Sequence, residues 1–216
     1  MYRPPAFRVD DSRALYEMIA QHPLATLITA GDDGIRTTQI PMIAAPDHRE
    51  GLLIGHIARA NPQWRSLGQG GESVALFTGE RHYISPEWYA STHEHGRTVP
   101  TYDYIVVEAR GSVRVVHELA ELREFVIALS DREERRIGGA WSAESLSSSF
   151  MDAQLAAVVG IEFQVASLSG SFKLSQNHSE RDIGGVVSGL RALGEASATS
   201  IASMIASAAI AAGGEP

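Results

Sequence analysis

The chain has 216 residues, of which 44% are hydrophobic and 20% charged, and these proportions are ordinary for a packed globular protein. It contains no cysteine, which excludes disulfides, thiolate metal ligands and cysteine nucleophiles. The formal net charge of −8 disfavours direct DNA binding, because nonspecific DNA affinity depends on Lys and Arg neutralising phosphates. Residues 1–5 lack the apolar core of a signal peptide, so we expect a cytoplasmic protein.

The first half of the chain predicts one helix followed by strands. The helix covers residues 13–21, with Ser12 as its N-cap, and Pro23 ends it. Apolar segments rich in Thr, Val and Ile then predict strands, the first two joined by a turn at 31–34. The predicted strands of the whole chain are residues 24–29, 35–44, 52–57, 74–78, 102–116 and 161–165. Too few helices separate them for parallel βαβ units, so we expect a mainly β fold, a closed or nearly closed antiparallel barrel with attached helices.

The second half adds predicted helices at 118–130 and 150–159, separated by a polar loop through Gly138 and Gly139. Acidic and basic residues are interleaved in the run 132–136, which we interpret as a solvated helix end.

The last residues differ in composition from the rest of the chain. We expect one domain over residues 1–192 and an Ala/Ser-rich segment over 193–216. Within that segment, residues 196–212 predict a helix that docks on the barrel or on a second subunit, and a frayed tail is the alternative. The segment is too polar and slightly too short for a membrane span, so no membrane contact is expected.

The stretch GHIARANPQW, residues 55–64, predicts a helix start that binds an anion. Asn61 can cap the helix and Pro62 suits its first position, and the helix is expected to reach about Gly68. A helix N-terminus offers unpaired N–H groups, and the guanidinium of Arg59 suits phosphate. The alternative is that Arg59 and Asn61 only cap and solubilise a surface helix.

The stretch HYISPEWY, residues 82–89, repeats this pattern. Ser85 and Pro86 form a second cap-plus-proline start, and Trp88 and Tyr89 follow directly. The repetition favours a polar ligand that has a flat apolar part. The alternative is that both aromatic residues lie in the core or at its rim.

A third polar stretch, FKLSQN, covers residues 172–177 at the end of an apolar strand. Its polar side chains are Lys173, Ser175, Gln176 and Asn177. Either they form a solvated turn, or Lys173 and Ser175 close a phosphate or carboxylate pocket, and the spacing does not distinguish the two.

Histidines supply the remaining candidates. His56 ends a predicted half-buried strand and is a core histidine, a hydrogen-bond donor to a ligand, or an axial ligand of haem iron. His93 and His95 flank Glu94 in a segment expected to be an exposed loop, with a metal clip as the alternative. The sequence contains no dinucleotide-binding, P-loop, serine-hydrolase or zinc-protease motif.

Taken together, the motifs resemble those of the PaiB family, which is usually described as FMN-binding negative transcriptional regulators. The resemblance runs from Met1 to about Leu190 and depends on several motifs in one order. These are PLATLIT (23–29), ARANPQW (58–64), YISPEWY (83–89), VPTYDY (99–104) and KLSQN (173–177).

The resemblance implies an FMN-binding split β-barrel related to the pyridoxamine-phosphate oxidases, which forms a homodimer with ligand sites at the subunit interface. It implies that the second strand runs along the flavin ring and that the turn after the next strand binds the phosphate. The implied cofactor-binding residues are Thr37, Thr38, Gln39 and Ile40 at the ring, His56, Arg59 and Asn61 at the phosphate, Ser85, Trp88, Tyr89 and Thr101 on the ring or substrate side, and Lys173, Ser175, Gln176 and Asn177 completing the pocket.

Three positions depart from the family pattern. Tyr102 and Asp103 stand where the family usually has Trp-Asn, and Ser171 stands where a Lys is common. The loss of a cation and the gain of a carboxylate make the pocket less favourable for an anionic cofactor.

Three functions therefore follow from the sequence. The first is an FMN-binding oxidoreductase or redox-linked regulator. The second is a haem b enzyme resembling piperazate synthase, which forms an N–N bond from N-hydroxyornithine, with His56 as the iron ligand. The third is a transcriptional regulator without catalysis. Tyr89, Tyr102 and Asp103 are acid–base candidates by location alone.

Overall fold

The structure is a computed structural model that describes residues 1–31, 34–46, 51–67, 71–211 and 213. The chain forms two compact units. Unit 1 comprises Met1–Leu15, Thr78–Val107 and Ser169–Pro216, and unit 2 comprises Tyr16–Phe77 and Glu108–Leu168.

Strands of the described chain form one antiparallel sheet. They are β1 (Arg8–Val9), β2 (Leu24–Gly31), β3 (Gly34–Ala44), β4 (Leu52–Ala58), β5 (Ser73–Ile84), β6 (Thr101–Val116) and β7 (Val158–Lys173). The strand order is β1-β7-β4-β3-β2-β5-β6, and a further pairing of β7 with β6 closes the ring. The residues of the long strands β5, β6 and β7 are divided between the two units. The predicted closed antiparallel barrel with attached helices is confirmed.

The alternation of side chains along β2 shows why this segment forms a strand. Ala25, Leu27 and Thr29 are buried, while Leu24 is exposed and the residues between them are less buried. A period of two places one set of side chains on the core face and the other set on the opposite face. β3 pairs with β2 along its length, from Leu24 opposite Pro41 to Gly31 opposite Gly34.

The chain also contains α-helices and short 3-10 helices. The α-helices are α1 (Ser12–Gln21), α2 (Ala90–His95), α3 (Leu119–Ile137), α4 (Ser148–Ala156), α5 (Glu180–Ala192) and α6 (Ala196–Ala211). The 3-10 helices are η1 (Pro5–Phe7), η2 (Pro62–Arg65), η3 (Pro86–Trp88) and η4 (Ala143–Ser145). Among the described residues, no helix is both long enough and apolar enough to cross a membrane.

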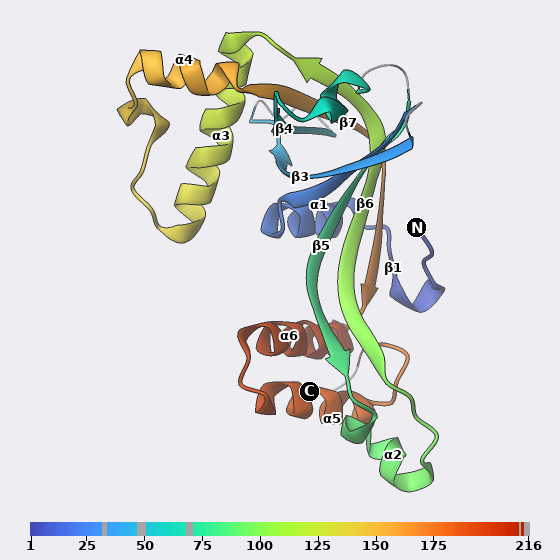
Figure 1. The fold of residues 1–216 in the computed structure, drawn as a ribbon. Helices are drawn as coiled ribbons and strands as arrows, with labels where there is room; N and C mark the ends of the chain where they lie inside the picture. Colours follow the sequence, from blue (N-terminus) through green and yellow to red (C-terminus); the bar gives the residue numbers. More distant parts are fainter. Residues whose placement is uncertain (32–33, 47–50, 68–70, 212, 214–216) are drawn as a thin grey trace. The chain divides into compact units, whose positions relative to one another are not determined.

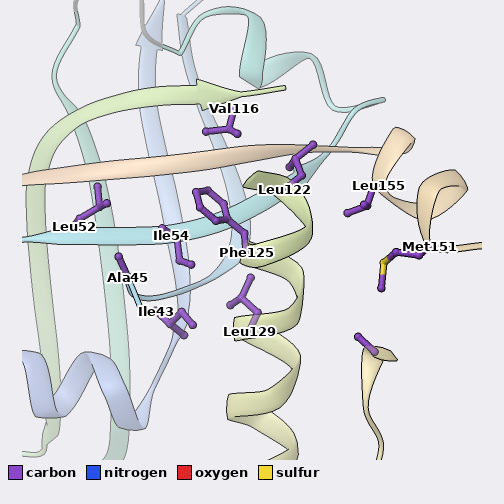
Figure 2. Close-up of a cluster of buried hydrophobic side chains, with 11 residues drawn as sticks. Ile43, Ala45, Leu52, Ile54, Val116, Leu122, Phe125, Leu129, Met151 and Leu155 are labelled. Atoms are coloured by element: carbon purple, nitrogen blue, oxygen red, sulfur yellow. The ribbon is translucent and has the colours of Figure 1, made fainter. Parts of the chain in front are cut away.

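Helices α3 and α4 cover an apolar cluster in unit 2 (Figure 2). Leu122, Phe125 and Leu129 lie one or two helical turns apart on α3 and face Ile43 and Ile54 of the sheet (Figure 2). This i, i+3, i+7 spacing places all three side chains on one helix face. The charged run 132–136 lies in the last turns of the same helix, so its interpretation as a helix end is confirmed.

In unit 1 the C-terminal segment forms helix α6, which packs against α5 (Figure 1). The buried side chains of α6 are Ala198, Ile201, Ala202 and Ile205, again on one helical face. The prediction of a helix is therefore confirmed for residues 196–211, where it packs on α5, whereas residue 212 lies outside the described residues.

Several predicted elements are corrected by the structure. Asp11 rather than Ser12 caps α1, because its Oδ2 accepts a hydrogen bond of 2.9 Å from the Ala14 amide. Helix α4 ends at Ala156, since the β-branched Val158 and Val159 begin β7. Residues 93–95 belong to the short helix α2 and not to a loop.

Candidate functional site

The predicted helix start at Asn61 is confirmed, but the helix is short. Asn61 has an extended backbone, and its side-chain Oδ1 accepts a hydrogen bond of 3.0 Å from the Gln63 amide. The helix is the single 3-10 turn η2, which ends at Arg65. The predicted continuation is wrong for residues 66 and 67, which are not helical, and residue 68 lies outside the described residues. A single turn aligns too few peptide dipoles to attract an anion by itself. Any anion held here needs a charged side chain.

Gln63, which the sequence did not single out, is the centre of a hydrogen-bond network in unit 2. It is 1% exposed, and its Nε2 lies 3.0 Å from the Thr29 hydroxyl and 3.3 Å from each of the Leu27 and Arg36 carbonyls. Its Oε1 accepts a short hydrogen bond from the Thr38 hydroxyl. The network fixes η2 to β2 and β3.

Arg59 is anchored to the end of α4. Its Nε donates to the Ala156 carbonyl at 2.7 Å and its Nη2 to the Val158 carbonyl at 2.8 Å. A cation beside the last carbonyls of a helix satisfies orphan acceptors and complements the helix dipole. Among the described residues, Nη1 of Arg59 has no hydrogen-bond partner. Arg59 therefore has a structural role and retains donors for a ligand.

His56 lies on β4 opposite Gly160 of β7. Its Nδ1 is buried and has no hydrogen-bond partner among the described residues. Burial lowers the pKa of the ring, because it disfavours the charged imidazolium, so His56 is neutral near pH 7. A buried ring nitrogen without a protein partner is rare in a folded protein.

Strand β3 presents both a face and an edge. Thr37 and Gln39 point to the exposed face, where the Gln39 amide donates to the Thr26 hydroxyl at 2.6 Å, and Ile40 is buried. Among the described strands, residues 34–41 pair with β2 alone, since the pairing with β4 covers only Met42–Ala44. The other backbone edge of β3 therefore offers N–H and C=O groups.

We call the predicted site residues of unit 2, together with Gln63, the β3–η2 cluster. It comprises Thr37, Thr38, Gln39, Ile40, His56, Arg59, Asn61 and Gln63. The hydrogen bond of 2.8 Å from Asn61 Nδ2 to the Thr38 hydroxyl joins its two halves.

The other predicted site residues lie in unit 1. The Lys173 ammonium donates to the Thr101 hydroxyl and, at 2.8 Å, to the Tyr102 carbonyl. Asp103 is 0% exposed, and its Oδ2 accepts a hydrogen bond of 2.6 Å from the Ser175 hydroxyl. Ser175 adopts a positive φ of 60°, a conformation that costs energy for a residue with a side chain. We call Thr101, Tyr102, Asp103, Lys173 and Ser175 the β6–β7 cluster.

Most donors of the β6–β7 cluster are used within the chain. Gln176 bonds to its own turn, accepting from the Leu174 amide at 2.6 Å and donating to the Phe172 carbonyl at 2.5 Å. Asn177 is exposed. Because Lys173 also faces the Asp103 carboxylate at 3.8 Å, its charge is compensated inside the protein. The arrangement fastens the end of β7 to the start of β6 and leaves Lys173 little capacity to attract a phosphate.

The acid–base candidates differ in their electrostatics. Burial raises the pKa of Asp103, and the Ser175 hydrogen bond and the Lys173 charge only partly oppose this shift. Burial, together with the charges of Asp103 and Asp182, raises the pKa of Tyr89 to about 12, which makes its phenol a poor acid near neutral pH. Tyr102 is 59% exposed, and its ring meets the Tyr83 ring edge to face, with 5.7 Å between the centroids.

The aromatic residues of the second motif pack inside unit 1. Ser85 caps η3 as predicted, accepting from the Glu87 amide at 3.3 Å. Trp88 lies against α5, where a Cβ on Gly185 or Gly189 would overlap it. Tyr89 is 1% exposed and stacks on the His178 ring at 4.6 Å between centroids. Both aromatics thus have intrachain packing partners, as the core alternative predicted.

The residues around His93 and His95 make protein contacts. His93 Nε2 lies 3.2 Å from the Glu87 carbonyl, and Glu94 forms an ion pair of 2.6 Å with Arg181. The described residues contain no group of three metal-ligating side chains.

Comparison with known protein families assigns the chain to one of them. The sequence profile of the family described as "Putative FMN-binding domain" matches residues 1–167. The chain belongs to this family. The match includes the whole β3–η2 cluster and ends before Lys173, and it supports FMN as the cofactor of a flavin-binding protein.

Relatives and solved structures agree with the FMN-binding domain family. The chain is 26% identical over 191 residues to protease synthase and sporulation protein PAI 2 of Bacillus subtilis, covering 88% of this chain and 89% of that protein, which confirms the resemblance to PaiB. It is 29% identical over 227 residues to an uncharacterized protein of Emericella nidulans, covering 88% and 90%.

Among solved structures, an FAD and heme binding protein of Mycobacterium smegmatis matches with a TM-score of 0.58 and 16% identity, covering 82% of this chain and 78% of that one. The flavocytochrome Anf3 of Azotobacter vinelandii matches with a TM-score of 0.58 and 12% identity, covering 85% and 78%. These similarities show the fold, which is the split β-barrel that the sequence predicted.

Proposed function

We propose that this protein holds FMN along β3 with the β3–η2 cluster and acts as a flavin-dependent oxidoreductase. The observation that carries the proposal is the one-sided pairing of residues 34–41, beside a loop that contains Arg59. A flavin ring carries hydrogen-bond donors and acceptors along its edge, which an open strand edge can match. Its phosphate needs a cation, which Arg59 supplies.

Each residue of the β3–η2 cluster has a separate task in this proposal. Arg59 directs its remaining N–H groups to the phosphate while two others hold the end of α4. His56 stays neutral near pH 7, so it places no charge of its own beside the ligand. Asn61 keeps the loop in place through Thr38. When bound, FMN supplies the redox chemistry at N5, and the protein supplies binding and orientation.

The surroundings of His56 favour FMN over haem. A histidine that ligates a metal nearly always donates its other ring N–H to a protein group. Within the described chain, Nδ1 has no such acceptor, so Nε2 would ligate iron without a partner to orient the ring. If Nδ1 were the ligand instead, its burial would keep iron away. We therefore propose FMN, and haem b is the alternative that the experiment below distinguishes.

We further propose that the working form is a homodimer. The exposed face of β2 and β3 carries Leu24 (58% exposed) and Ile35 (76% exposed), with Thr26, Ile28 and Thr37 between them and no charged side chain at these alternating positions. The centre of a protein interface is depleted in charges and rich in apolar groups. A second copy that covers this face would remove the exposed side chains from water.

The experiment is reconstitution of the apoprotein with FMN and, separately, with haemin, each followed by absorption spectroscopy after gel filtration. We expect one FMN per chain, retained through the column as two broad flavin bands, and no sharp Soret band from haemin. Retention of haemin with a sharp Soret band and no retention of FMN would overturn the proposal in favour of haem. Loss of both would overturn it altogether.

A further inference from the structure

The hydrogen-bond network around Gln63 has a direction that the structure determines. The Leu27 and Arg36 carbonyls can only accept, so the Gln63 nitrogen faces them and the Gln63 oxygen faces Thr38. The Thr38 hydroxyl must then donate its single proton to Gln63. Its oxygen accepts from Asn61 Nδ2 at 2.8 Å. The network closes into a ring, because Asn61 Oδ1 accepts a hydrogen bond of 3.0 Å from the backbone N–H of Gln63.

This direction determines what the network can offer a ligand. The Thr38 hydroxyl has no second proton, so it cannot donate to a flavin as well as to Gln63. Asn61 uses its Oδ1 and one N–H inside the network. Thr38, which is expected at the ring, and Asn61, which is expected at the phosphate, therefore hold each other in place, and the unpaired backbone groups of β3 and the guanidinium of Arg59 are left for a ligand.

We propose that Gln63 is the positioning residue of the flavin site. Gln63 does not touch the ligand, and the inference is based on the proposed FMN function. By binding both the Arg36 carbonyl and the Thr38 hydroxyl, Gln63 fixes the backbone of β3 against η2. Because η2 follows Arg59 by only three residues, the same side chain sets the separation between ring and phosphate contacts. Its burial at 1% exposure keeps water from competing for these bonds.

The test uses Gln63→Glu and Gln63→Leu in the full chain, with Gln154→Leu on the exposed face of α4 as the matched control. In Gln63→Glu an oxygen replaces the nitrogen that faces two carbonyls, so the buried side chain needs a proton to fit. We expect Gln63→Glu to bind FMN at least about tenfold more weakly than the wild type at about pH 8, and this ratio to shrink at about pH 5.5. We expect Gln63→Leu to bind FMN more weakly than the wild type at both pH values, and Gln154→Leu to bind it as the wild type does.

A second readout separates positioning from stability. Visible circular dichroism at saturating FMN reports the environment of the bound ring, which a change in protein stability alone does not alter. We expect Gln63→Leu to change this spectrum, and wild-type affinity with a wild-type spectrum would overturn the inference.

If Gln63→Leu does not fold, Thr38→Val decides, because it removes the same hydrogen bond from the other side. Unchanged FMN binding by folded Thr38→Val would then overturn the inference. Failure of the wild type itself to bind FMN would instead overturn the proposed function and this inference together.

Discussion

Replacing glycines of helix α5 by alanine is expected to stabilise the protein at one position and to destabilise it at the next. Gly184 is exposed, and a Cβ added there meets no atom within 4 Å. A Cβ on Gly185 would overlap the backbone carbonyl of Trp88, and one on Gly189 would overlap the Trp88 ring. The consequences differ, because a backbone atom cannot rotate away whereas a ring can tilt.

The magnitudes follow from helix propensity and overpacking. Alanine is favoured over glycine inside a helix by about 1 kcal/mol, so Gly184→Ala is expected to raise the free energy of unfolding by up to that amount. Gly185→Ala gains the same propensity but incurs an overpacking cost of about 1–3 kcal/mol or more. We therefore expect Gly185→Ala to be about 1–2 kcal/mol less stable than the wild type. Gly189→Ala is expected to fall between these two variants.

Urea unfolding of the three apoproteins, followed by far-ultraviolet circular dichroism, measures these differences. The comparison also tests the position of Trp88, which the sequence suggested as a residue lining the flavin. If Gly189→Ala is as stable as Gly184→Ala, the Trp88 ring does not pack on α5 and is free to contact a ligand.

Three further predictions concern the buried carboxyl of Asp103, the proposed dimer face and DNA binding. Burial raises the folded-state pKa of Asp103 above its ordinary value of 3.8, so the folded protein binds the proton more tightly than the unfolded chain, and the stability contributed by this group falls as pH rises from 3.8 through the folded-state pKa. Asp103→Asn is expected to remove this fall from the urea midpoints measured between about pH 4 and 8. The same change of midpoint with pH in the variant and the wild type would refute the prediction. Ile35→Asp places a charge on the proposed dimer face, so light scattering is expected to give a monomer mass for the variant and a dimer mass for the wild type; a monomeric wild type contradicts the proposal. With a net charge of −8, the protein is expected not to shift the anisotropy of a labelled duplex at about 150 mM salt, whereas saturable binding would favour a regulator.

The sequence located six of the strands and the start of η2, but it missed β1, and its strands at 74–78 and 161–165 are shorter than β5 (Ser73–Ile84) and β7 (Val158–Lys173). Alternating apolar residues such as Ala25 and Leu27 are local signals, and so is an Asn followed by a Pro. Helix α5 was not predicted, because Gly184, Gly185 and Gly189 lower its helix propensity. At two of these positions glycine is needed for the contact with Trp88, about a hundred residues earlier in the chain. No pattern confined to either segment reports such a contact.

The candidate site was only partly predictable for the same reason. Arg59 and Asn61 are recognisable because charge and capping are local properties. Gln63 next to a proline resembles an exposed helical residue, and its importance comes from carbonyls at Leu27 and Arg36, which only the folded sheet brings to it. Lys173 looks like an anion ligand in sequence, and the buried Asp103 beside it is what changes that interpretation.

The most direct test of the account compares FMN with riboflavin, which has the same ring and side chain but no phosphate. Both are titrated into wild-type, Arg59→Ala and Arg59→Lys apoproteins, and binding is measured by the quenching of flavin fluorescence. Riboflavin is the internal control, because Arg59→Ala also removes the bonds to Ala156 and Val158, and any structural damage from this loss weakens both ligands.

We predict that the wild type binds FMN about 10- to 100-fold more tightly than riboflavin, the effect of a charge-assisted hydrogen bond worth about 1.5–3 kcal/mol. This preference is expected to disappear in Arg59→Ala and to be partly retained in Arg59→Lys. Equal wild-type affinities for the two flavins, or a preference for FMN that survives in Arg59→Ala, would contradict the placement of the phosphate at Arg59.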